Sequence, residues 1–188
     1  MQHTLTLSDG DICVRPLEPD QDAAVLRELV DDEIWAGMSA PLPRDDAAMV
    51  AHLEAMTDRG GLMAFTIERD GRVVGLTTFY DLVPGLRVEI GNTFYARAQW
   101  GGPLNPTVKL LMLEHAFGEL ALSRVALRCD SRNTRSHRAI ARLGARYEGT
   151  LRRFRPAADG TVADVDYFSI LRQEWPQVRA GLRERLGR

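Results

Sequence analysis

Two glycines and a proline stand directly before an apolar helical pattern, an arrangement that can bind an anion. Gly101, Gly102 and Pro103 precede a segment from Pro106 to about Leu120 whose apolar side chains recur with helical spacing. The first backbone N–H groups of a helix lack partners within the helix, and the helix dipole adds a partial positive charge there. The loop is therefore a candidate phosphate site. Glycine and proline pairs more often form a plain turn, so both interpretations are open.

Charge is unevenly distributed along the chain. Residues 1–60 contain thirteen acidic and four basic side chains, whereas residues 121–155 contain ten arginines against Asp130 and Glu148. Two solvated faces account for part of this asymmetry. An anionic ligand near the basic segment and a cationic ligand near the acidic part are the more specific interpretation. The arginines do not alternate with stacking aromatic residues, so nucleic acid is not the expected partner.

Composition indicates an ordinary globular protein that forms one domain over residues 1–188. Of the 188 residues, 45% are hydrophobic and 27% are charged. No segment approaches the ~20 apolar residues of a membrane span, and the N-terminus lacks the basic and apolar regions of a secretory signal. Cys13 and Cys129 lie far apart in strand-like segments. They favour reduced core cysteines over a disulfide or metal pair, and we expect a cytoplasmic protein without a metal.

The elements that must position these residues are predicted in the order β-α-α-β-β-β-α-β-α-β-β, a mixed α/β protein. The predicted strands are 11–17, two runs within 62–80, 86–95, 124–130, 146–153 and 161–171. The predicted helices are 19–32, 45–61, 106–120, 133–144 and 174–186, with a loop around Trp35. Asp70-Gly71 predicts a tight hairpin turn, Asp45 or Asp46 a helix N-cap, and Gly144 a helix C-cap.

Strand 86–95 contains an acidic side chain among apolar ones. Simple alternation places Val88, Ile90 and Phe94 on one face, and Glu89, Thr93 and Tyr95 on the other. Gly91-Asn92 suggests a bulge, which would interrupt this alternation.

Three stretches, read together, resemble the GNAT superfamily of acyl-CoA-dependent N-acetyltransferases, and within it the ribosomal-protein N-acetyltransferase-like branch. The stretches are "EIGNTFYARAQWGGPLNPTVKLLMLEHAF", "RVALRCDSRNTRSHRAIARLGARYEGTLR" and "DGTVADVDYFSILRQEW". The second contains the complete family pattern Asn-x-x-Ser-x-x-Ala-Ile-x-x-Leu-Gly-x-x-x-Glu-Gly, from Asn133 to Gly149. The resemblance runs from Asp11 to about Trp175. It implies a mostly antiparallel mixed sheet of about seven strands flanked by helices, splayed between strands 4 and 5.

The resemblance also implies an acyl-CoA site, with the glycine loop as the diphosphate cradle. The implied residues are Thr93, Phe94, Tyr95, Trp100, Gly101, Gly102, Leu104, Asn105, Lys109, Asn133, Ser136 and Arg138. The family loop Gln/Arg-x-x-Gly-x-Gly/Ala is matched only in part, whether it starts at Gln99 or at Trp100. Pro103 has no N–H, so one donor is missing and CoA affinity is in question. Lys109 is the only lysine beside twenty-three arginines, which makes it either a phosphate contact or a chance residue on an exposed helix face.

The implied reaction is attack of a primary amine on the acyl-CoA thioester, which needs a proton acceptor and a proton donor. Glu89 occupies a strand position where the family often has a base that acts through water; a solvated carboxylate or an arginine partner is the alternative. Where many relatives have an acid tyrosine, this chain has Ile140. Ser136, near the sulfur, a bound water or Tyr167 must then supply the proton. Helix capping beside Asn133 is the structural alternative for Ser136.

Two other kinds of protein fit the same residues. A catalytically weak acyl-CoA-binding sensor or subunit of the same fold is favoured by Pro103 and Ile140. A nucleic-acid binder would show a steep salt dependence. The amine acceptor stays unidentified, and the acyl group is acetyl or, if Arg152, Arg153 or Arg155 binds a second carboxylate, succinyl. A homodimer is compatible with the sequence.

Overall fold

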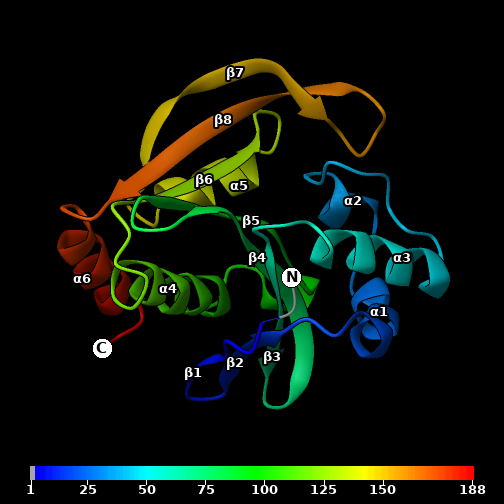
Figure 1. The fold of residues 1–188 in the computed structure, drawn as a ribbon, viewed down its shortest axis with the longest axis horizontal. Helices are drawn as coiled ribbons and strands as arrows, with labels where there is room; N and C mark the ends of the chain where they lie inside the picture. The colour runs from blue at the N-terminus through cyan, green and yellow to red at the C-terminus, as the bar shows by residue number, and fades with distance from the viewer. Residues whose placement is uncertain (1–2) are drawn as a thin grey trace.

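An eight-stranded mixed sheet forms the centre of the molecule, and helices cover both of its faces (Figure 1). The computed structural model describes residues 3–188. The strands lie in the order β1-β2-β3-β4-β5-β6-β8-β7, and all neighbours are antiparallel except β5 and β6. The strands are β1 (Leu7–Asp9), β2 (Ile12–Pro16), β3 (Met63–Arg69), β4 (Arg72–Val83), β5 (Arg87–Tyr95), β6 (Arg124–Asp130), β7 (Arg146–Pro156) and β8 (Val162–Leu171). The helices are α1 (Pro19–Glu28), α2 (Asp32–Trp35), α3 (Asp46–Thr57), α4 (Leu104–Phe117), α5 (Thr134–Ala141) and α6 (Trp175–Arg185), with a 3-10 turn η1 (Arg97–Gln99).

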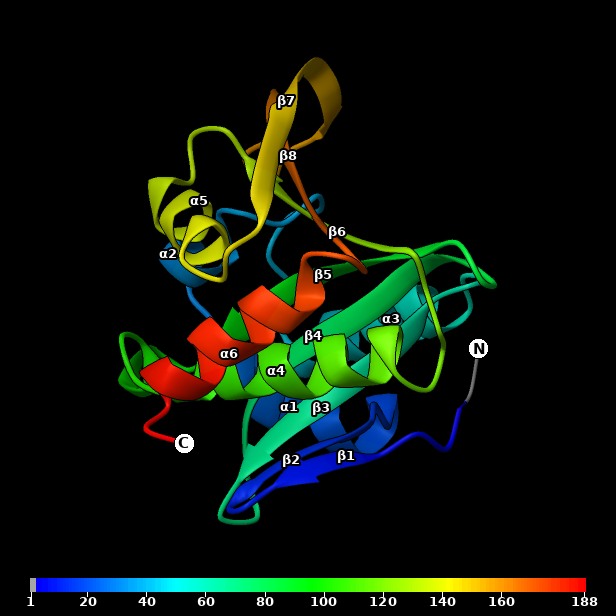
Figure 2. The same ribbon diagram turned by 90° about the vertical axis from the view of Figure 1, so that its left-hand side faces the viewer.

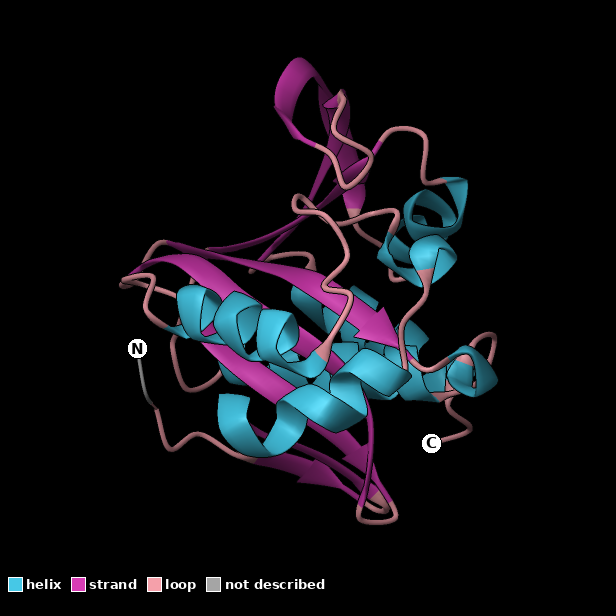
Figure 3. Cartoon of the chain, turned by 90° about the vertical axis from the view of Figure 1, so that its right-hand side faces the viewer, coloured by secondary structure: helices cyan, strands magenta, loops and turns pink. Residues whose placement is uncertain are grey.

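Two apolar cores lie on opposite faces of the sheet. One lies under α4 and α6 and includes Val88, Ile90 and Met112, all nearly inaccessible to solvent. The other lies under α1, α2 and α3 and includes Trp35 and Phe94. Figures 2 and 3 show these two helical layers from opposite sides of the molecule. Burial of apolar surface on both faces fixes the sheet between them.

The structure has one strand more than the sequence predicted. Leu7–Asp9 forms β1 and pairs antiparallel with β2, with Ser8 opposite Cys13. Gly10, with a φ of 59°, makes the tight turn between them. A three-residue strand is too short to show a convincing alternation of apolar and polar side chains, which is why it escaped prediction. The predicted loop around Trp35 is likewise corrected, because Asp32–Trp35 forms the short helix α2.

The predicted hairpin turn and the predicted N-cap are confirmed. Asp70 and Gly71 have φ values of 50° and 69° and join β3 to β4 in a tight hairpin. The Asp45 side chain accepts a hydrogen bond from the Ala48 N–H and caps α3. The C-cap of α5 is Arg142 rather than the predicted Gly144, which follows two residues later with a φ of 92°.

A bulge in β5 corrects the predicted distribution of its side chains. Asn92 has a φ of 46°, and the pairing of β5 with β4 shifts register at this point. Before the bulge, Val88 and Ile90 face α4; after it, Phe94 packs into the opposite core. The Tyr95 hydroxyl instead donates to Asn105 of α4, at 3.1 Å. Glu89 and Tyr95 therefore do not share a face, because the extra residue inverts the alternation.

The sheet opens between β5 and β6. These are the fourth and fifth of the seven predicted strands, where the resemblance implied a splayed sheet. These parallel strands pair only from Arg87–Ile90 and Arg124–Leu127. Beyond Ile90 and Leu127 both strands continue without pairing to each other. Backbone groups on the facing edges are therefore available to a ligand in the gap.

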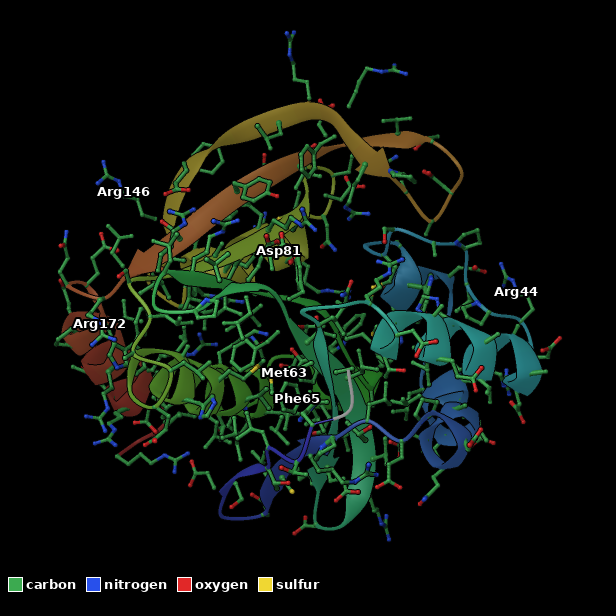
Figure 4. The ribbon with its side chains drawn as sticks, viewed as in Figure 1. Arg44, Met63, Phe65, Asp81, Arg146 and Arg172 are labelled. Atoms are coloured by element: carbon green, nitrogen blue, oxygen red, sulfur yellow. The ribbon has the colours of Figure 1, made fainter. Side chains whose placement is uncertain are left out.

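The long β7–β8 hairpin extends from the sheet above α5 and reaches toward α2 (Figure 1). Arg155 connects its end to the helical layer, donating to the carbonyls of Gly37 and Met38 at 2.8 Å and 3.0 Å. Figure 4 shows Arg146 pointing away from the molecule at the other end of the hairpin. Met63 and Phe65 lie in the interior in the same view. The hairpin and the α2 loop thus meet at one end of the gap between β5 and β6.

Candidate active site

The opening between β5 and β6 forms a cleft of about 250 Å³. Its walls come from β5, η1 and α4 on one side, and from β6 and α5 on the other. The segment after α2 and the β7 residue Arg155 also line it. This cleft lies where the sequence placed its candidate site, at the end of β5 and the beginning of α4.

One end of the cleft presents the unpaired N-terminus of α4. Thr107 N–H is bonded to the Pro103 carbonyl at 3.0 Å, which leaves the N–H groups of Leu104 and Asn105 without helical acceptors. Pro103 is the N-cap residue and supplies no side-chain cap. Gly101 adopts a φ of 77°, so the loop before the helix needs a residue that tolerates this conformation. A 14-residue helix with free N–H groups facing a cleft is suited to an anion such as a diphosphate.

Lys109 lies at the base of the cleft, one turn further along α4. Its ammonium group donates to Thr93 Oγ1 at 3.0 Å, and Thr93 Oγ1 lies 2.8 Å from Thr77 Oγ1. The side chain is 5% exposed, and burial lowers its pKa to about 7. No ion pair joins it to a carboxylate within residues 3–188. Of the two interpretations of Lys109, the one that places it on an exposed helix face is wrong, because Lys109 is a buried amine that lines the cleft.

Asn133 and Ser136 lie on the opposite wall, at the beginning of α5. Asn133 Oδ1 accepts a hydrogen bond from Ser136 N–H at 2.9 Å and caps the helix. The capping role is thus performed by Asn133, and its Nδ2 group is left to donate elsewhere. Cys129 lies beside Ser136, and burial raises the pKa of its thiol to about 11. Ile140 also lines the cleft and makes this part of the wall apolar.

Glu89 is buried behind a tyrosine rather than exposed in the cleft. The Tyr80 hydroxyl donates to Glu89 Oε1, and Arg128 Nε lies 2.8 Å from the same oxygen. Tyr80 and Arg128 line the cleft, whereas Glu89 is 5% exposed and does not. Burial raises the pKa of Glu89, and Arg128 and Tyr80 oppose that rise. Burial also raises the pKa of Tyr80 well above its usual value, so the phenol stays protonated and is a donor.

Two aromatic rings of the β7–β8 hairpin complete this arrangement. The Arg128 guanidinium lies 5.6 Å from the ring centroids of Phe154 and Tyr167, and it donates to the Tyr167 hydroxyl at 2.6 Å. Tyr167 itself does not line the cleft. Arg128 is therefore held in place by Glu89 and by rings, and it fixes the position of the Glu89 carboxylate.

Most of the predicted acyl-CoA residues line this one cleft. They are Thr93, Phe94, Tyr95, Trp100, Gly101, Gly102, Asn105, Lys109, Asn133 and Ser136. Two do not: the Leu104 side chain is fully buried in the core, and Arg138 is exposed on α5 outside the lining.

Several residues that line the cleft had not been singled out from the sequence. They are Tyr80, Arg128, Arg142 and Arg185. Tyr80 lies opposite Glu89 in the β4–β5 pairing, so a correct hairpin register would have placed them together. Arg142 follows Arg135 by seven residues, a spacing that places both on one face of a helix and that could have been recognised in the sequence. Arg185 belongs to a distant helix, and no local pattern predicts its approach.

Three further observations concern membrane spans, metal ligands and cysteines among the described residues. No helix in the described part of the chain is long and apolar enough to cross a membrane. Residues 3–188 contain no cluster of three or more His, Cys, Asp or Glu suited to a metal ion. Cys13 and Cys129 are both free thiols.

Comparison with known proteins bears on the family and the fold. Residues 11–146 match the family model "Acetyltransferase (GNAT) domain". An uncharacterized N-acetyltransferase, YnaD of Bacillus subtilis (strain 168), is 29% identical over 103 residues, 55% of this chain and 59% of that protein. The chain thus spans less than two thirds of that relative's length.

Two solved structures resemble the whole fold. A protein from T. thermophilus assigned as an acetyltransferase is 34% identical, with a TM-score of 0.90 and 99% of both chains covered. Mycobacterium smegmatis RimJ in complex with CoA-disulfide is 27% identical, with a TM-score of 0.77 and coverage of 94% of this chain and 90% of that one.

Proposed function

The chain belongs to the GNAT acetyltransferase family, and from this premise we propose that it transfers an acetyl or related acyl group from acyl-CoA directly to a primary amine. The observation that carries the proposal is the cleft between β5 and β6, which has unpaired helix N–H groups at one end and a buried carboxylate behind Tyr80. The RimJ structure contains a CoA derivative, which is consistent with a CoA site in this fold.

The α4 N-terminus is the proposed diphosphate site. The N–H groups of Gly101, Leu104 and Asn105 donate to phosphate oxygens, and the helix dipole adds to the attraction. Leu104 contributes through its backbone alone, because its side chain is buried. Lys109 and the Asn133 Nδ2 group contact the pantetheine arm from opposite walls. Acyl-CoA supplies the activated thioester.

The proposed proton acceptor is Glu89 acting through Tyr80. The Tyr80 hydroxyl lies between Glu89 and the cleft, so the attacking amine gives its proton to the Tyr80 oxygen as Tyr80 passes its own to Glu89. Tyr80 therefore remains a phenol throughout, consistent with its raised pKa. The raised pKa of Glu89 makes the carboxylate a better base than an exposed one.

Ser136 is the proposed proton donor to the departing thiolate. It lines the cleft, and its N–H is already fixed by Asn133 Oδ1. Tyr167 is not assigned this role because it lies outside the lining of the cleft.

A catalytically weak acyl-CoA-binding protein is the second candidate, favoured by the burial of Glu89 behind Tyr80 and by Ile140 in the cleft wall. Turnover separates the two. Acetyl-CoA binding is measured by calorimetry, and thiol release is measured with a panel of N-terminal peptides, polyamines, amino sugars and small amines. Transfer to at least one acceptor class supports the enzyme; tight binding with no transfer to any of them supports the binding protein. Absence of acetyl-CoA binding contradicts both.

A further inference from the structure

Two arginines from separate helices face the outer end of the cleft without a carboxylate partner. Arg142 lies at the end of α5 and Arg185 at the end of α6, and both line the cleft, as does Pro106 in the first turn of α4. Both are exposed. Within residues 3–188, neither guanidinium has a hydrogen bond or an ion pair to another side chain, which leaves both free for an anion.

The antiparallel packing of α6 on α4 explains why Arg185 reaches this place. The Trp175 ring stacks on Phe117 at 5.4 Å, so α6 starts beside the end of α4 and runs back toward its beginning (Figure 2). Arg179 and Arg183, on the way, both pair with Glu114 of α4. Those two arginines hold the helices together, whereas Arg185 lies beyond them at the α4 N-terminus.

The end of α5 meets the same helix. Gly144 packs against Val178 of α6, where an added Cβ would lie 3.2 Å from Cγ2. At 1.5 Å per residue, Arg185 lies about 10 Å further along α6 than this contact. Arg142 and Arg185 therefore come from two different helices to line the same cleft.

We propose that Arg142 and Arg185 bind the 3′-phosphate of the CoA adenosine and so select CoA over its dephosphorylated analogue. The inference rests on the proposed function, because it takes the α4 N-terminus as the diphosphate site. The diphosphate already has the free N–H groups of α4, so two further cations at the outer end match the remaining dianionic group. Arginine suits this role because its planar guanidinium binds phosphate oxygens with two parallel donors.

The third arginine of this region is not part of the pair. Arg135 stacks on the Trp100 ring at 3.5 Å and lies 3.9 Å from Glu33. Its charge is thus partly compensated, and it is expected to hold Trp100 rather than to choose between nucleotides.

The test compares the dissociation constants of CoA and dephospho-CoA, measured by calorimetry at low salt. The wild-type protein should prefer CoA by about tenfold or more, since charged hydrogen bonds at a partly screened site are each worth a few-fold to tenfold. Arg142→Ala and Arg185→Ala should each weaken CoA binding by about three- to tenfold and leave dephospho-CoA within about twofold. The double variant should bind both ligands nearly equally.

Matched controls remove the same charge elsewhere. The controls are Arg183→Ala and Arg146→Ala. The Arg183 side chain of α6 pairs with Glu114. The Arg146 side chain of β7 points away from the molecule (Figure 4). Both should keep the wild-type ratio. A free-phosphate titration should displace CoA only at far higher concentration, because it lacks the diphosphate and pantetheine contacts.

The outcomes separate this inference from the proposed function. If CoA and dephospho-CoA bind equally to the wild-type protein, or if the double variant keeps the preference, the phosphate site is wrong while the CoA cleft stands. If the two controls lose the preference as well, the effect is general charge attraction and the inference is overturned. If the wild-type protein binds neither ligand, the proposed function fails and this inference fails with it.

Discussion

Replacing Lys109 by methionine should stabilise the protein and weaken its binding of acetyl-CoA at the same time. Lys109 is 5% exposed, and within residues 3–188 the one side chain to which its ammonium donates a hydrogen bond is that of Thr93, at 3.0 Å. A pKa that falls from 10.5 to about 7 makes the protonated amine about 5 kcal/mol less favourable in the folded chain than in the unfolded chain. Methionine has a similar shape and no charge, so it removes that cost.

The expected gain depends on pH in a defined direction. The unfolded chain keeps the Lys109 proton up to about pH 10.5, whereas the folded chain releases it near pH 7. Between these values the unfolded state binds more protons, so wild-type stability rises with pH relative to the variant. The lost hydrogen bond to Thr93 reduces the gain in the free energy of unfolding by about 1–1.5 kcal/mol. The Lys109→Met variant should therefore be more stable than the wild-type protein by about 3 kcal/mol at pH 6 and by almost nothing near pH 9.5.

Urea unfolding, followed by tryptophan fluorescence at pH 6, 8 and 9.5, measures the difference in the free energy of unfolding between the variant and the wild-type protein. Other ionisable groups titrate in both proteins alike, so their contributions cancel in this difference. Thr93→Val is the matched control, since it removes the hydrogen bond but keeps the buried amine; it should destabilise the protein at pH 6. Calorimetry should show weaker acetyl-CoA binding by Lys109→Met. A variant that is less stable than wild type at pH 6, or a difference that is constant from pH 6 to 9.5, would refute the assignment of Lys109 as a costly buried amine.

Four further substitutions test the rest of the cleft. Glu89→Gln should lower turnover by ~10²–10⁴-fold at pH 7 with little change in acetyl-CoA affinity, and the loss should shrink at high pH where the free amine is abundant. Tyr80→Phe should have a similar effect, and the double variant should lose little more than either single variant; independent, multiplying losses would contradict a shared proton path. Asn133→Ser keeps a side-chain oxygen to cap α5 but removes the Nδ2 donor, so it should weaken acetyl-CoA binding by the order of 1–3 kcal/mol while the melting temperature stays near that of wild type. Unchanged affinity would place the pantetheine contact elsewhere. Gly91→Ala should reproduce the turnover loss of Tyr80→Phe, because an added Cβ would lie 2.8 Å from the Tyr80 hydroxyl oxygen and displace the ring; retention of full turnover would show that the position of Tyr80 does not matter.

Most of the order of elements, and most of the residues that line the cleft, were predictable because they depend on local signals. The Asp70-Gly71 turn, the Asp45 cap and the glycine loop before α4 act within a few residues, and all three are present in the structure. The family pattern from Asn133 to Gly149 then located the opposite wall of the cleft.

The details that failed depend on residues that are distant in the sequence. The side-chain faces of β5 were misassigned because one residue, Asn92, inverts the alternation, and the extent of a bulge is fixed by pairing with β4. Tyr80 covers Glu89 only because the β4–β5 register brings them together. Lys109 was not predicted to be buried, because its burial depends on how α4 packs under β5. Tertiary packing decides each of these, and no local pattern reports it.

A crystal structure of the protein grown with CoA is the most direct test of the proposed site. The diphosphate should lie within hydrogen-bonding distance of the N–H groups of Gly101, Leu104 and Asn105, with the pantetheine arm between β5 and β6 and its thiol near Ser136. A CoA molecule bound outside the cleft, or bound within it with the diphosphate away from the α4 N-terminus, would contradict the account.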